Sequence, residues 1–431
     1  MTVGGGPLSS ATPLGTGEPG LHRRTPRERL SARDPAPEPA ANDAASADRS
    51  DLDELASIAR QAGLRRVHFV AWRDLDDPEA GGSELHAHRI ASQWAAAGLE
   101  VTFRTSAVPN RPERIERDGY RVIRRQGRYA VFPGVAWEGL RRSARPGDAL
   151  VEIWNGMPFF SPLWYRGPRV VFLHHVHAEM WRMVLPDHLA RIGETVEGRL
   201  APSLYRKSRV ITLSESSRRE IIDLLNMSPA RVSVAAPGIE PKFSPGGSRS
   251  SVPLVVAVGR LVPVKRFDLL IQALAQARTR FPDLRAVIVG EGYERGALEA
   301  LRAQCAAEEW LEMPGRMSDD DLIDHYRRAW VVASTSLREG WGMTLTEAAA
   351  CGTPAVATDI AGHRDAVVHG STGLLAEGID GVSEALARVL GDDGLRGRLG
   401  AGALQRSRWY TWPATARSTL AVLAEEATRR R

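Results

Sequence analysis

The sequence predicts an α/β protein made of two doubly wound parallel-sheet domains that face each other across a cleft. The chain has 431 residues, which exceeds one compact domain and suits two domains of about 150 to 200 residues each. Short apolar runs alternate with amphipathic stretches, as expected where helices cover the faces of a parallel sheet. A segment rich in Pro, Gly and Ser at residues 234–253 interrupts this alternation, which then restarts and indicates a second domain.

The first half of the chain begins with a segment that differs from the rest. Residues 1–50 are rich in Pro, Gly, Ala and Ser and contain no Ile, Phe, Tyr or Trp, so we expect a disordered tail. Residues 51–243 are expected to form the amino-terminal domain. Its predicted elements are strands at residues 67–71, 101–103, 149–153, 170–173 and 210–213, and a helix at residues 84–97.

The second half repeats the pattern over residues 244–408, the expected carboxy-terminal domain. Its predicted strands are residues 254–258, 285–289, 331–333 and 355–358, and its predicted helices are residues 267–280, 294–306, 319–329 and 344–350. Residues 409–431 start near the aromatic stretch RWYTWP and continue as an amphipathic helix. In folds of this class, ligands bind at the carboxyl ends of the strands, where the functional residues are expected.

Composition limits the classes of function. Basic residues number 57 and acidic residues 52, a net charge of +5 that raises nucleic acid or an anionic membrane as a partner. Only Lys207, Lys242 and Lys265 are lysines, which indicates arginine-rich coding, and no nucleic-acid partner is expected. Cys305 and Cys351 are too few for a disulfide framework, which suggests a reducing, cytoplasmic location. No apolar run approaches the roughly 20 residues that span a bilayer, so any membrane contact is expected to be peripheral.

The motif with the most chemistry is LREGWGMTLTEAAACGTP, which ends at Pro354. Glu339 lies in a loop after a strand, Gly340 and Gly342 allow close backbone approach, and a helix is expected to begin near Met343. Free amides at a helix start suit an anionic phosphate. Glu347 follows about one turn into the helix. Carboxylates accept hydrogen bonds from paired hydroxyls, so the two glutamates suit a sugar on one side of the phosphates and a ribose on the other.

With its flanking residues GWGMTLTEAAACGTPAV, this pair of glutamates resembles the Glu-x7-Glu motif of retaining glycosyltransferases of family 4. The resemblance extends over roughly residues 65 to 425. It implies the GT-B architecture of two Rossmann-like domains, with acceptor binding in the first and nucleotide-sugar binding in the second. It also implies that Glu339 contacts the donor sugar and Glu347 the ribose. The donor-binding loop it implies contains Gly340, Trp341, Gly342, Met343, Thr344 and Leu345.

Two further loops are candidates for the phosphates. In VGRLVPVKR, Arg260 and Lys265 are placed to flank a diphosphate and stabilise it as a leaving group. The resemblance implies that this pair acts without a metal ion. In DPEAGGSE, Gly81 and Gly82 allow the backbone to approach a ligand, and Ser83 is a candidate helix cap. The resemblance implies that this turn touches the donor phosphates.

A histidine cluster follows the predicted strand at residues 170–173, in the sequence VVFLHHVHAEMW. The resemblance implies that His174 lies beside the donor sugar, whereas His175 replaces an Asp that is common in the family. A zinc site is the rival interpretation. His175 and His177 lie two residues apart on the expected strand, and no Cys or carboxylate pair follows at ligand spacing, so no metal is expected.

The segment LEMPGRMSDDD at residues 311–321 is expected to be a loop, because Pro314 and Gly315 favour a turn, with Ser318 as a helix cap. The resemblance implies that this loop reaches the nucleobase through the backbone near Arg316 and Met317. The nearby sequence VIVGEG lacks the GxGxxG spacing of dinucleotide-binding proteins, so no NAD is expected.

Together these features predict retaining, metal-independent transfer of a glycosyl group from a UDP or GDP sugar to a small-molecule acceptor in a biosynthetic pathway, without a cofactor. Arg260, Lys265 and the amides of residues 342–345 would stabilise the diphosphate, while Glu339 and His174 hold the sugar as the catalytic residues.

Other functions stay open at this point, and the oligomeric state is not indicated. A nucleotide-sugar epimerase or a phosphorylase can use the same architecture. A peripheral membrane transferase with a lipid or polysaccharide acceptor is suggested by the basic charge and by the aromatics of IWNGMPFFSPLW, which are Trp154, Phe159, Phe160 and Trp164. A protein core or a small-acceptor pocket is the preferred interpretation of these aromatics.

Overall fold

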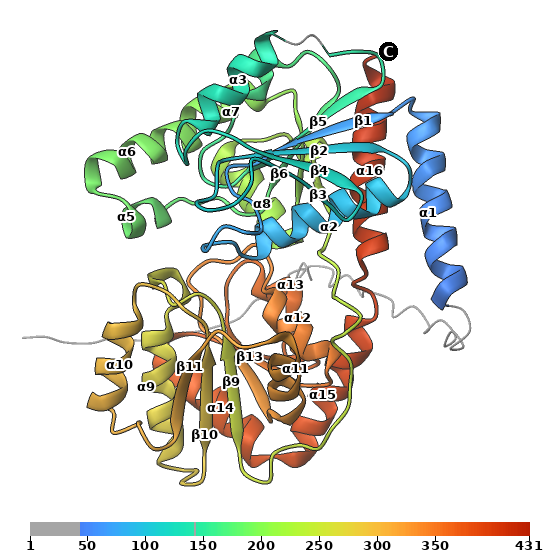
Figure 1. Cartoon of the computed structure of the whole chain (residues 1–431). Helices are drawn as coiled ribbons and strands as arrows, with labels where there is room; N and C mark the ends of the chain where they lie inside the picture. Colours follow the sequence, from blue (N-terminus) through green and yellow to red (C-terminus); the bar gives the residue numbers. More distant parts are fainter. Residues whose placement is uncertain (1–43, 142–143) are drawn as a thin grey trace, which may run out of the picture. The chain divides into compact units, whose positions relative to one another are not determined.

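The structure is a computed structural model that describes residues 44–141 and 144–431. Residues 45–431 form one compact unit, which is described here by itself. Figure 1 shows two parallel sheets with helices on their faces, which confirms the prediction that both halves are doubly wound. No helix of the described residues is long and apolar enough to cross a membrane.

In the described part of the chain, the first sheet has the strand order β3-β4-β2-β1-β5-β6-β7-β8. Its strands are β1 (Arg66–Val70), β2 (Glu100–Thr105), β3 (Arg114–Arg117), β4 (Tyr120–Arg124), β5 (Asp148–Trp154), β6 (Arg169–Leu173), β7 (Arg209–Thr212) and β8 (Val232–Val234). β3 and β4 form an antiparallel hairpin at the sheet edge, while β1 pairs in parallel with both β2 and β5.

The second sheet has the order β11-β10-β9-β12-β13-β14 over the residues described. Its strands are β9 (Leu254–Val258), β10 (Arg285–Val289), β11 (Leu311–Gly315), β12 (Val331–Ser334), β13 (Ala355–Thr358) and β14 (Gly373–Ala376). This is the strand order of dinucleotide-binding sheets, in which ligands bind where the winding direction reverses. That reversal lies between β9 and β12 here, and between β1 and β5 in the first sheet.

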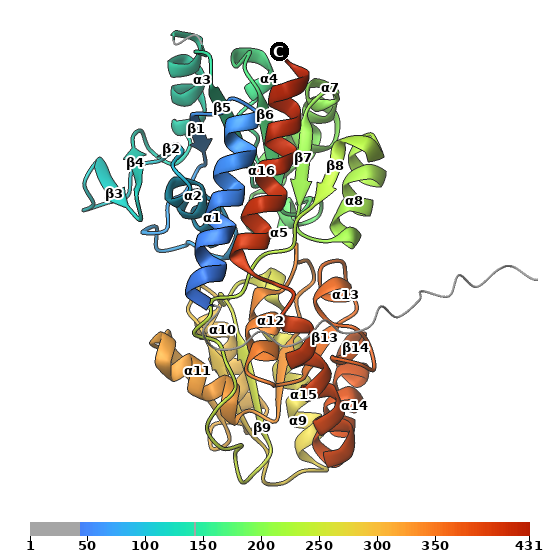
Figure 2. The same cartoon turned by 90° about the vertical axis from the view of Figure 1, so that its right-hand side faces the viewer.

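Helices cover both sheets (Figures 1 and 2). The first half contains α1 (Ala44–Gln61), α2 (Gly82–Ala96), α3 (Val131–Arg141), α4 (Ser161–Trp164), α5 (Met180–Val184), α6 (Asp187–Thr195), the π-helix η1 (Val196–Leu200), α7 (Ala201–Tyr205), α8 (Glu215–Leu225) and the 3₁₀ turn η2 (Pro229–Arg231). The second half contains the 3₁₀ turn η3 (Pro263–Lys265), α9 (Phe267–Arg278), α10 (Arg295–Gln304), α11 (Asp319–Arg328), α12 (Met343–Ala350), α13 (His363–Ala366), α14 (Gly378–Gly391), α15 (Asp393–Ser407) and α16 (Trp412–Arg429).

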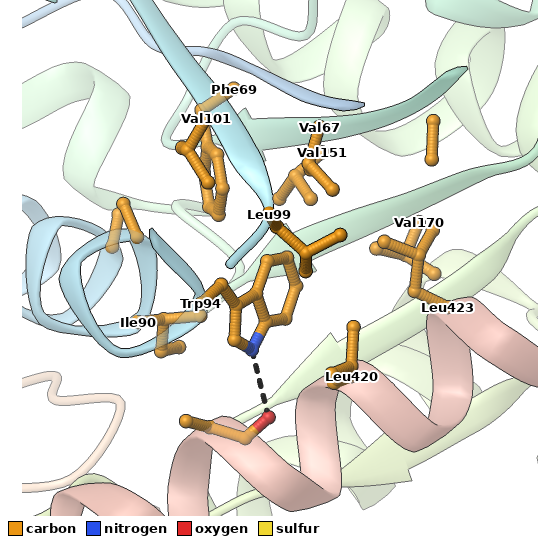
Figure 3. Close-up of a cluster of buried hydrophobic side chains, with 14 of the residues drawn as sticks. Val67, Phe69, Ile90, Trp94, Leu99, Val101, Val151, Val170, Leu420 and Leu423 are labelled. Carbon is orange, nitrogen blue, oxygen red and sulfur yellow. Dashed lines mark hydrogen bonds between the residues drawn. The ribbon is translucent and has the colours of Figure 1, made fainter. Parts of the chain in front are cut away.

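The last helix, α16, returns to the first sheet, where it runs beside α1 (Figure 2). Figure 3 shows Leu420 and Leu423 of α16 packed in the same cluster as Trp94 of α2 and Val170 of β6. The indole N–H of Trp94 donates a hydrogen bond to the carbonyl of Ala416 at 3.0 Å. The core of the first sheet is therefore completed by residues from the other end of the chain.

Two expectations about local structure are wrong. Residues 1–43 of the expected tail lie outside the described residues, but residues 44–50 belong to α1. This helix is stable because Leu55 and Ala59, four residues apart on one face, are buried in the first core together with Ala62, which follows the helix. The expected loop at residues 311–321 begins as the strand β11. Pro314 fits there because β11 is an edge strand and its pairing with β10 is irregular at that point.

The aromatics considered for a membrane or acceptor contact belong largely to the protein core. Trp154, Phe159 and Trp164 are buried, and Phe160 packs against a core cluster that contains Trp154. Apolar side chains that are already removed from water gain nothing from a lipid surface. Trp154, Phe159 and Trp164 are therefore not available for membrane contact.

Replacing Leu420 by alanine tests the packing of α16. Leu420 is 0% exposed, so Leu420→Ala should leave a cavity in the first core. We expect the free energy of unfolding, measured by chemical denaturation, to fall by about 2–5 kcal/mol. Leu224→Ala is the matched control, because Leu224 is 51% exposed, and it should change stability by less than about 0.5 kcal/mol. Equal losses in the two variants would contradict this packing.

Candidate functional site

The loops that follow the strands at the two reversal points meet each other. A Cβ atom on Gly340 would lie 2.4 Å from the carbonyl oxygen of His174, and one on Gly82 would lie 3.1 Å from Sδ of Met343. Ser217 Oγ also donates to the carbonyl of Gly340 at 3.2 Å. We call the group formed by Gly81, Gly82, His174, Arg260, Lys265, Glu339, Gly340 and the first residues of α12 the interdomain site.

The glycine turn is held by a carboxylate. Gly81 is the N-cap of α2, and its N–H donates to Glu84 Oε2 at 2.9 Å. Ser83 lies inside the first turn and donates to the same oxygen at 2.9 Å, so the expectation that Ser83 caps the helix is wrong. Glu84 can accept from the N–H of Gly81 because it occupies the third helical position, from which a Glu side chain reaches back to the N-cap. Ser83 Oγ in turn accepts a hydrogen bond from Asn155 Nδ2 at 3.1 Å.

Glu339 is an ionised carboxylate. Its Oε1 forms an ion pair with Lys265 Nζ and accepts a hydrogen bond from Ser336 Oγ at 2.9 Å. Burial alone would raise the pKa of Glu339, but Lys265 and the neighbouring His363 outweigh it and lower this pKa to about 2. Lys265 therefore holds Glu339 in the charged form.

Arg260 is the unpaired cation of the interdomain site. It is half-buried, and among the described residues its guanidinium has no hydrogen bond or ion pair. Its Nε lies 3.8 Å from the position of a Cβ on Gly81. Burial and the neighbouring Arg73 lower the pKa of Arg260, yet a guanidinium stays protonated at neutral pH. A half-buried charge without a protein partner is costly, so this position favours an anionic ligand.

The pKa of Glu347 is raised, whereas the pKa of Glu339 is lowered. Glu347 lies in α12, where its Oε2 accepts a hydrogen bond from the hydroxyl of Tyr326 at 3.2 Å. Burial raises the pKa of Glu347 to about 7, because this hydrogen bond and the charge of Lys242 only partly offset the desolvation of the carboxylate. Glu347 therefore titrates near neutral pH.

The amino terminus of α12 offers free amides. Gly342 caps the helix with a φ of 106°, which favours glycine. Among the described residues, no acceptor is found for the N–H groups of Gly342, Met343 and Thr344, whereas Leu345 N–H donates to Gly342 at 3.0 Å. The expected set of free amides therefore ends at Thr344. The side chains of Trp341 and Leu345 are buried in apolar clusters, so neither side chain is available to a ligand.

His174, His175 and His177 follow strand β6 and do not belong to it. β6 ends at Leu173, so His175 and His177 lie in the loop, with their rings stacked at 4.8 Å. His174 is 3% exposed, and its Nε2 lies 3.1 Å from Nδ1 of His86. Burial and the neighbouring His86 hold the pKa of His174 well below its usual range, so the ring is neutral. Within the described ranges, no group of three or more His, Cys, Asp and Glu residues is arranged to hold a metal ion.

Glu197 was not identified from the sequence, although it organises the histidine loop. This buried carboxylate of η1 accepts hydrogen bonds from the backbone N–H of His177 at 2.9 Å and of Ala178 at 3.0 Å. It also accepts one from the indole N–H of Trp181 at 3.0 Å. Its position depends on a π-helical turn, for which the sequence contains no local signal.

The remaining predicted donor residues follow β11. Arg316 donates a hydrogen bond from its guanidinium to the carbonyl of Pro78 in the first half of the chain. Met317 packs against the core of the second sheet, and Ser318 caps α11 by accepting from Asp321 N–H at 3.1 Å, as predicted. The segment is thus tied to the turn that leads to Gly81.

Comparison with known proteins points to one class of enzyme. The family model "Glycosyltransferase Family 4" matches residues 80–243, and "Glycosyl transferases group 1" matches residues 239–406. A D-inositol 3-phosphate glycosyltransferase of Kribbella flavida is 34% identical over 418 residues, which cover 83% of this chain and 95% of that relative. A relative of the same name from Acidothermus cellulolyticus is 33% identical, with coverage of 87% and 94%.

Solved structures show the same architecture. Sucrose-phosphate synthase from Thermosynechococcus elongatus superposes with a TM-score of 0.69 at 20% identity and covers 82% of this chain and 96% of its own. Anabaena HepE in complex with UDP and glucose has a TM-score of 0.65 at 18% identity, with coverage of 83% and 98%. At this level of identity the likeness concerns the fold, and it confirms the expected GT-B architecture.

The raised pKa of Glu347 predicts how stability depends on pH. Its pKa rises from 4.5 to about 7 on folding, so the folded state favours the protonated carboxyl. The free energy of unfolding therefore falls as pH increases between these two values, because the folded state must then bury the ionised form. Glu347→Gln mimics the neutral acid. We expect the variant to exceed the parent in unfolding free energy by about 1–3 kcal/mol at pH 8, and the difference to vanish near pH 4.5.

The control for this prediction is Glu308→Gln, because Glu308 is exposed. It should show the same stability as the parent at both pH values in chemical denaturation. A Glu347→Gln variant whose stability difference does not change with pH would show that this carboxyl titrates normally.

Proposed function

Because this chain belongs to family 4 of the glycosyltransferases, we propose that it transfers a glycosyl group from a nucleotide-diphosphate sugar to a small-molecule acceptor, with retention of the anomeric configuration. The observation that carries this proposal is the unpaired guanidinium of Arg260, which stands beside the Lys265–Glu339 ion pair and the free amides of α12. Such a group of donors suits a diphosphate.

In the proposed reaction, the bond between the anomeric carbon and the diphosphate oxygen breaks, and a bond to an acceptor oxygen forms on the same face of the sugar. The proton of the acceptor hydroxyl passes to the departing phosphate oxygen. Arg260, Lys265 and the amides of Gly342, Met343 and Thr344 stabilise the negative charge that develops on the diphosphate. No enzymatic nucleophile and no covalent intermediate are needed.

Glu339 and His174 hold the donor sugar. Glu339 is ionised and can accept hydrogen bonds from sugar hydroxyls, while Lys265 is shared between this carboxylate and the phosphates. His174 contributes its Nδ1, a buried atom without a hydrogen-bond partner in the described chain. The contact of His174 Nε2 with His86 keeps the ring oriented.

For the nucleotide, we assign the ribose to Glu347 and the base to the backbone near Arg316 and Met317. A UDP donor is the first choice, because the similar Anabaena HepE is described in complex with UDP and glucose. GDP is the second choice. Glu347 accepts from two ribose hydroxyls more strongly when both of its oxygens are ionised acceptors, so donor affinity should fall as pH drops below about 7.

A phosphorylated polyol is the proposed acceptor. The relatives are named D-inositol 3-phosphate glycosyltransferases, and this chain has surplus positive charge beside the glycine turn. Arg73 forms ion pairs with Glu79 and Glu84, and Arg128 forms an ion pair with Glu79. Arg260 interacts electrostatically with both carboxylates. The surplus charge is that of Arg260, which the donor diphosphate occupies, so an acceptor phosphate would replace the exposed Glu79 as the partner of Arg73 and Arg128.

Arg260→Ala tests the leaving-group assignment. We expect kcat for transfer or donor hydrolysis to fall about 100- to 1000-fold, because one preorganised donor to the developing charge is removed. The control is Arg398→Ala, since Arg398 is exposed in the second half and outside the interdomain site. A parental rate for Arg260→Ala would refute the role of this residue.

The substrate assignments need a separate measurement. Thermal shifts with UDP, GDP, ADP and dTDP identify the nucleotide, and mass spectrometry then follows product formation with inositol 3-phosphate and with unphosphorylated inositol. We expect the phosphorylated acceptor to be the better substrate. Equal turnover of the two acceptors would contradict the proposed phosphate contact, without affecting the donor assignment.

A further inference from the structure

A second hollow lies at the other end of the first sheet. It is a cavity of about 910 Å³ lined by residues 62–65, 144–148 and 163–168 and by Ala427, Arg430 and Arg431. These residues flank the amino-terminal starts of β1, β5 and β6. The interdomain site follows the carboxyl ends of the same strands, so the two sites lie at opposite ends of the sheet.

The cavity is strongly basic. Arg65, Arg145, Arg166 and Arg431 line it, and in the described part of the chain none of their guanidinium groups pairs with a carboxylate. Arg430 also lines it but is held by Glu426, and Asp148 is the one acidic lining residue. Asp148 forms an ion pair with Arg66, so it does not neutralise the four free arginines. The cavity therefore suits an anion.

A buried hydroxyl inside the cavity supports the same conclusion. Tyr165 lines the cavity and is only 7% exposed, yet its hydroxyl has no hydrogen-bond partner among the described residues. Buried polar groups in folded proteins are nearly always hydrogen-bonded. A phosphate oxygen in the cavity would supply the missing acceptor.

The rim of the cavity is apolar. Leu140 of α3 and Leu163 of α4 line it and are 64% and 65% exposed, and Trp137, which precedes Leu140 by three residues in α3, is 57% exposed. Arg141 stacks over the Trp137 ring at 4.3 Å. Figures 1 and 2 show α3 at the same end of the first sheet as the carboxyl end of α16. A free phosphate ion gains no favourable contact from these apolar side chains. The boundary between the headgroups and the acyl chains of a bilayer accommodates both aromatic and aliphatic groups beside arginines.

We propose that this face, formed by the cavity and by Trp137, Leu140 and Leu163, docks on an anionic lipid surface. The free arginines and Tyr165 bind headgroup phosphates, while the three exposed apolar side chains insert at the boundary with the acyl chains. Nucleic acid presents phosphates too, but it offers no apolar phase for these three residues.

The docking face and the interdomain site lie at opposite ends of the same strands. β1 and β6 have five residues each and β5 has seven, so about 17–23 Å of strand separates the docking face from the interdomain site. A membrane-docked molecule would hold that site away from the lipid surface. Its acceptor then reaches it from water, which agrees with a small hydrophilic acceptor.

Vesicle binding by the full chain tests the docking face. Binding is measured by co-sedimentation at moderate salt, with vesicles of phosphatidylcholine alone and with vesicles that also contain phosphatidylglycerol. We expect binding only to the anionic vesicles. Arg145→Glu combined with Arg166→Glu should weaken it by about 100-fold or more, since each basic residue contributes about a fivefold factor and reversing its charge applies that factor twice. Leu140→Ser combined with Leu163→Ser should weaken it by at least about tenfold.

The matched controls are Arg398→Glu and Leu224→Ser, exposed residues outside this face, which should bind as the parent does. Donor hydrolysis without vesicles should be unchanged in every variant, so failure of docking is separable from failure of the proposed function. Absence of binding to anionic vesicles would overturn the proposal. Binding that is insensitive to the leucine changes, or that millimolar inorganic phosphate abolishes, would assign the cavity to soluble phosphate and overturn lipid docking.

Discussion

The close approach of Gly340 to the carbonyl of His174 is the constraint on which the interdomain site depends. A side chain at residue 340 would collide with that carbonyl, so glycine is required where the loop after β12 meets the loop after β6. This contact brings the unpaired Arg260 and the Lys265–Glu339 pair to the same place as the glycine turn before α2. The fold thereby concentrates positive charge and free amides where no single segment of the chain could place them.

The two glutamates of the motif show how a tertiary environment distinguishes identical side chains. Glu339 is ionised because Lys265 and His363 outweigh its burial, whereas Glu347 has only a tyrosine hydroxyl as its direct partner. One carboxylate is thus permanently charged, and the other responds to pH near neutrality. We infer that the fixed charge suits the reacting sugar, and that the titrating group links donor binding to pH.

The elements identified from the sequence are those whose apolar residues recur with the period of a strand or a helix, whereas β3, β4, β8 and β14 were not predicted. β9 and α9, for example, match the expected ranges closely. The failures have identifiable causes. α1 begins in a polar segment and is stabilised by burial of Leu55 and Ala59 in a core that also contains residues of α2 and α16. Pro314 suggested a loop, but an edge strand tolerates it.

By itself, the sequence determined the fold class, the positions of strands such as β9 and the motif residues, since periodicity, glycine positions and residue spacing are local properties. Only the tertiary structure decided that Arg260 has no ion-pair partner among the described residues, that Lys265 is held by Glu339 and that Glu197 organises the histidine loop. Those features depend on distances between residues far apart in the chain. Local patterns carry no information about such distances, because packing of the whole unit sets them.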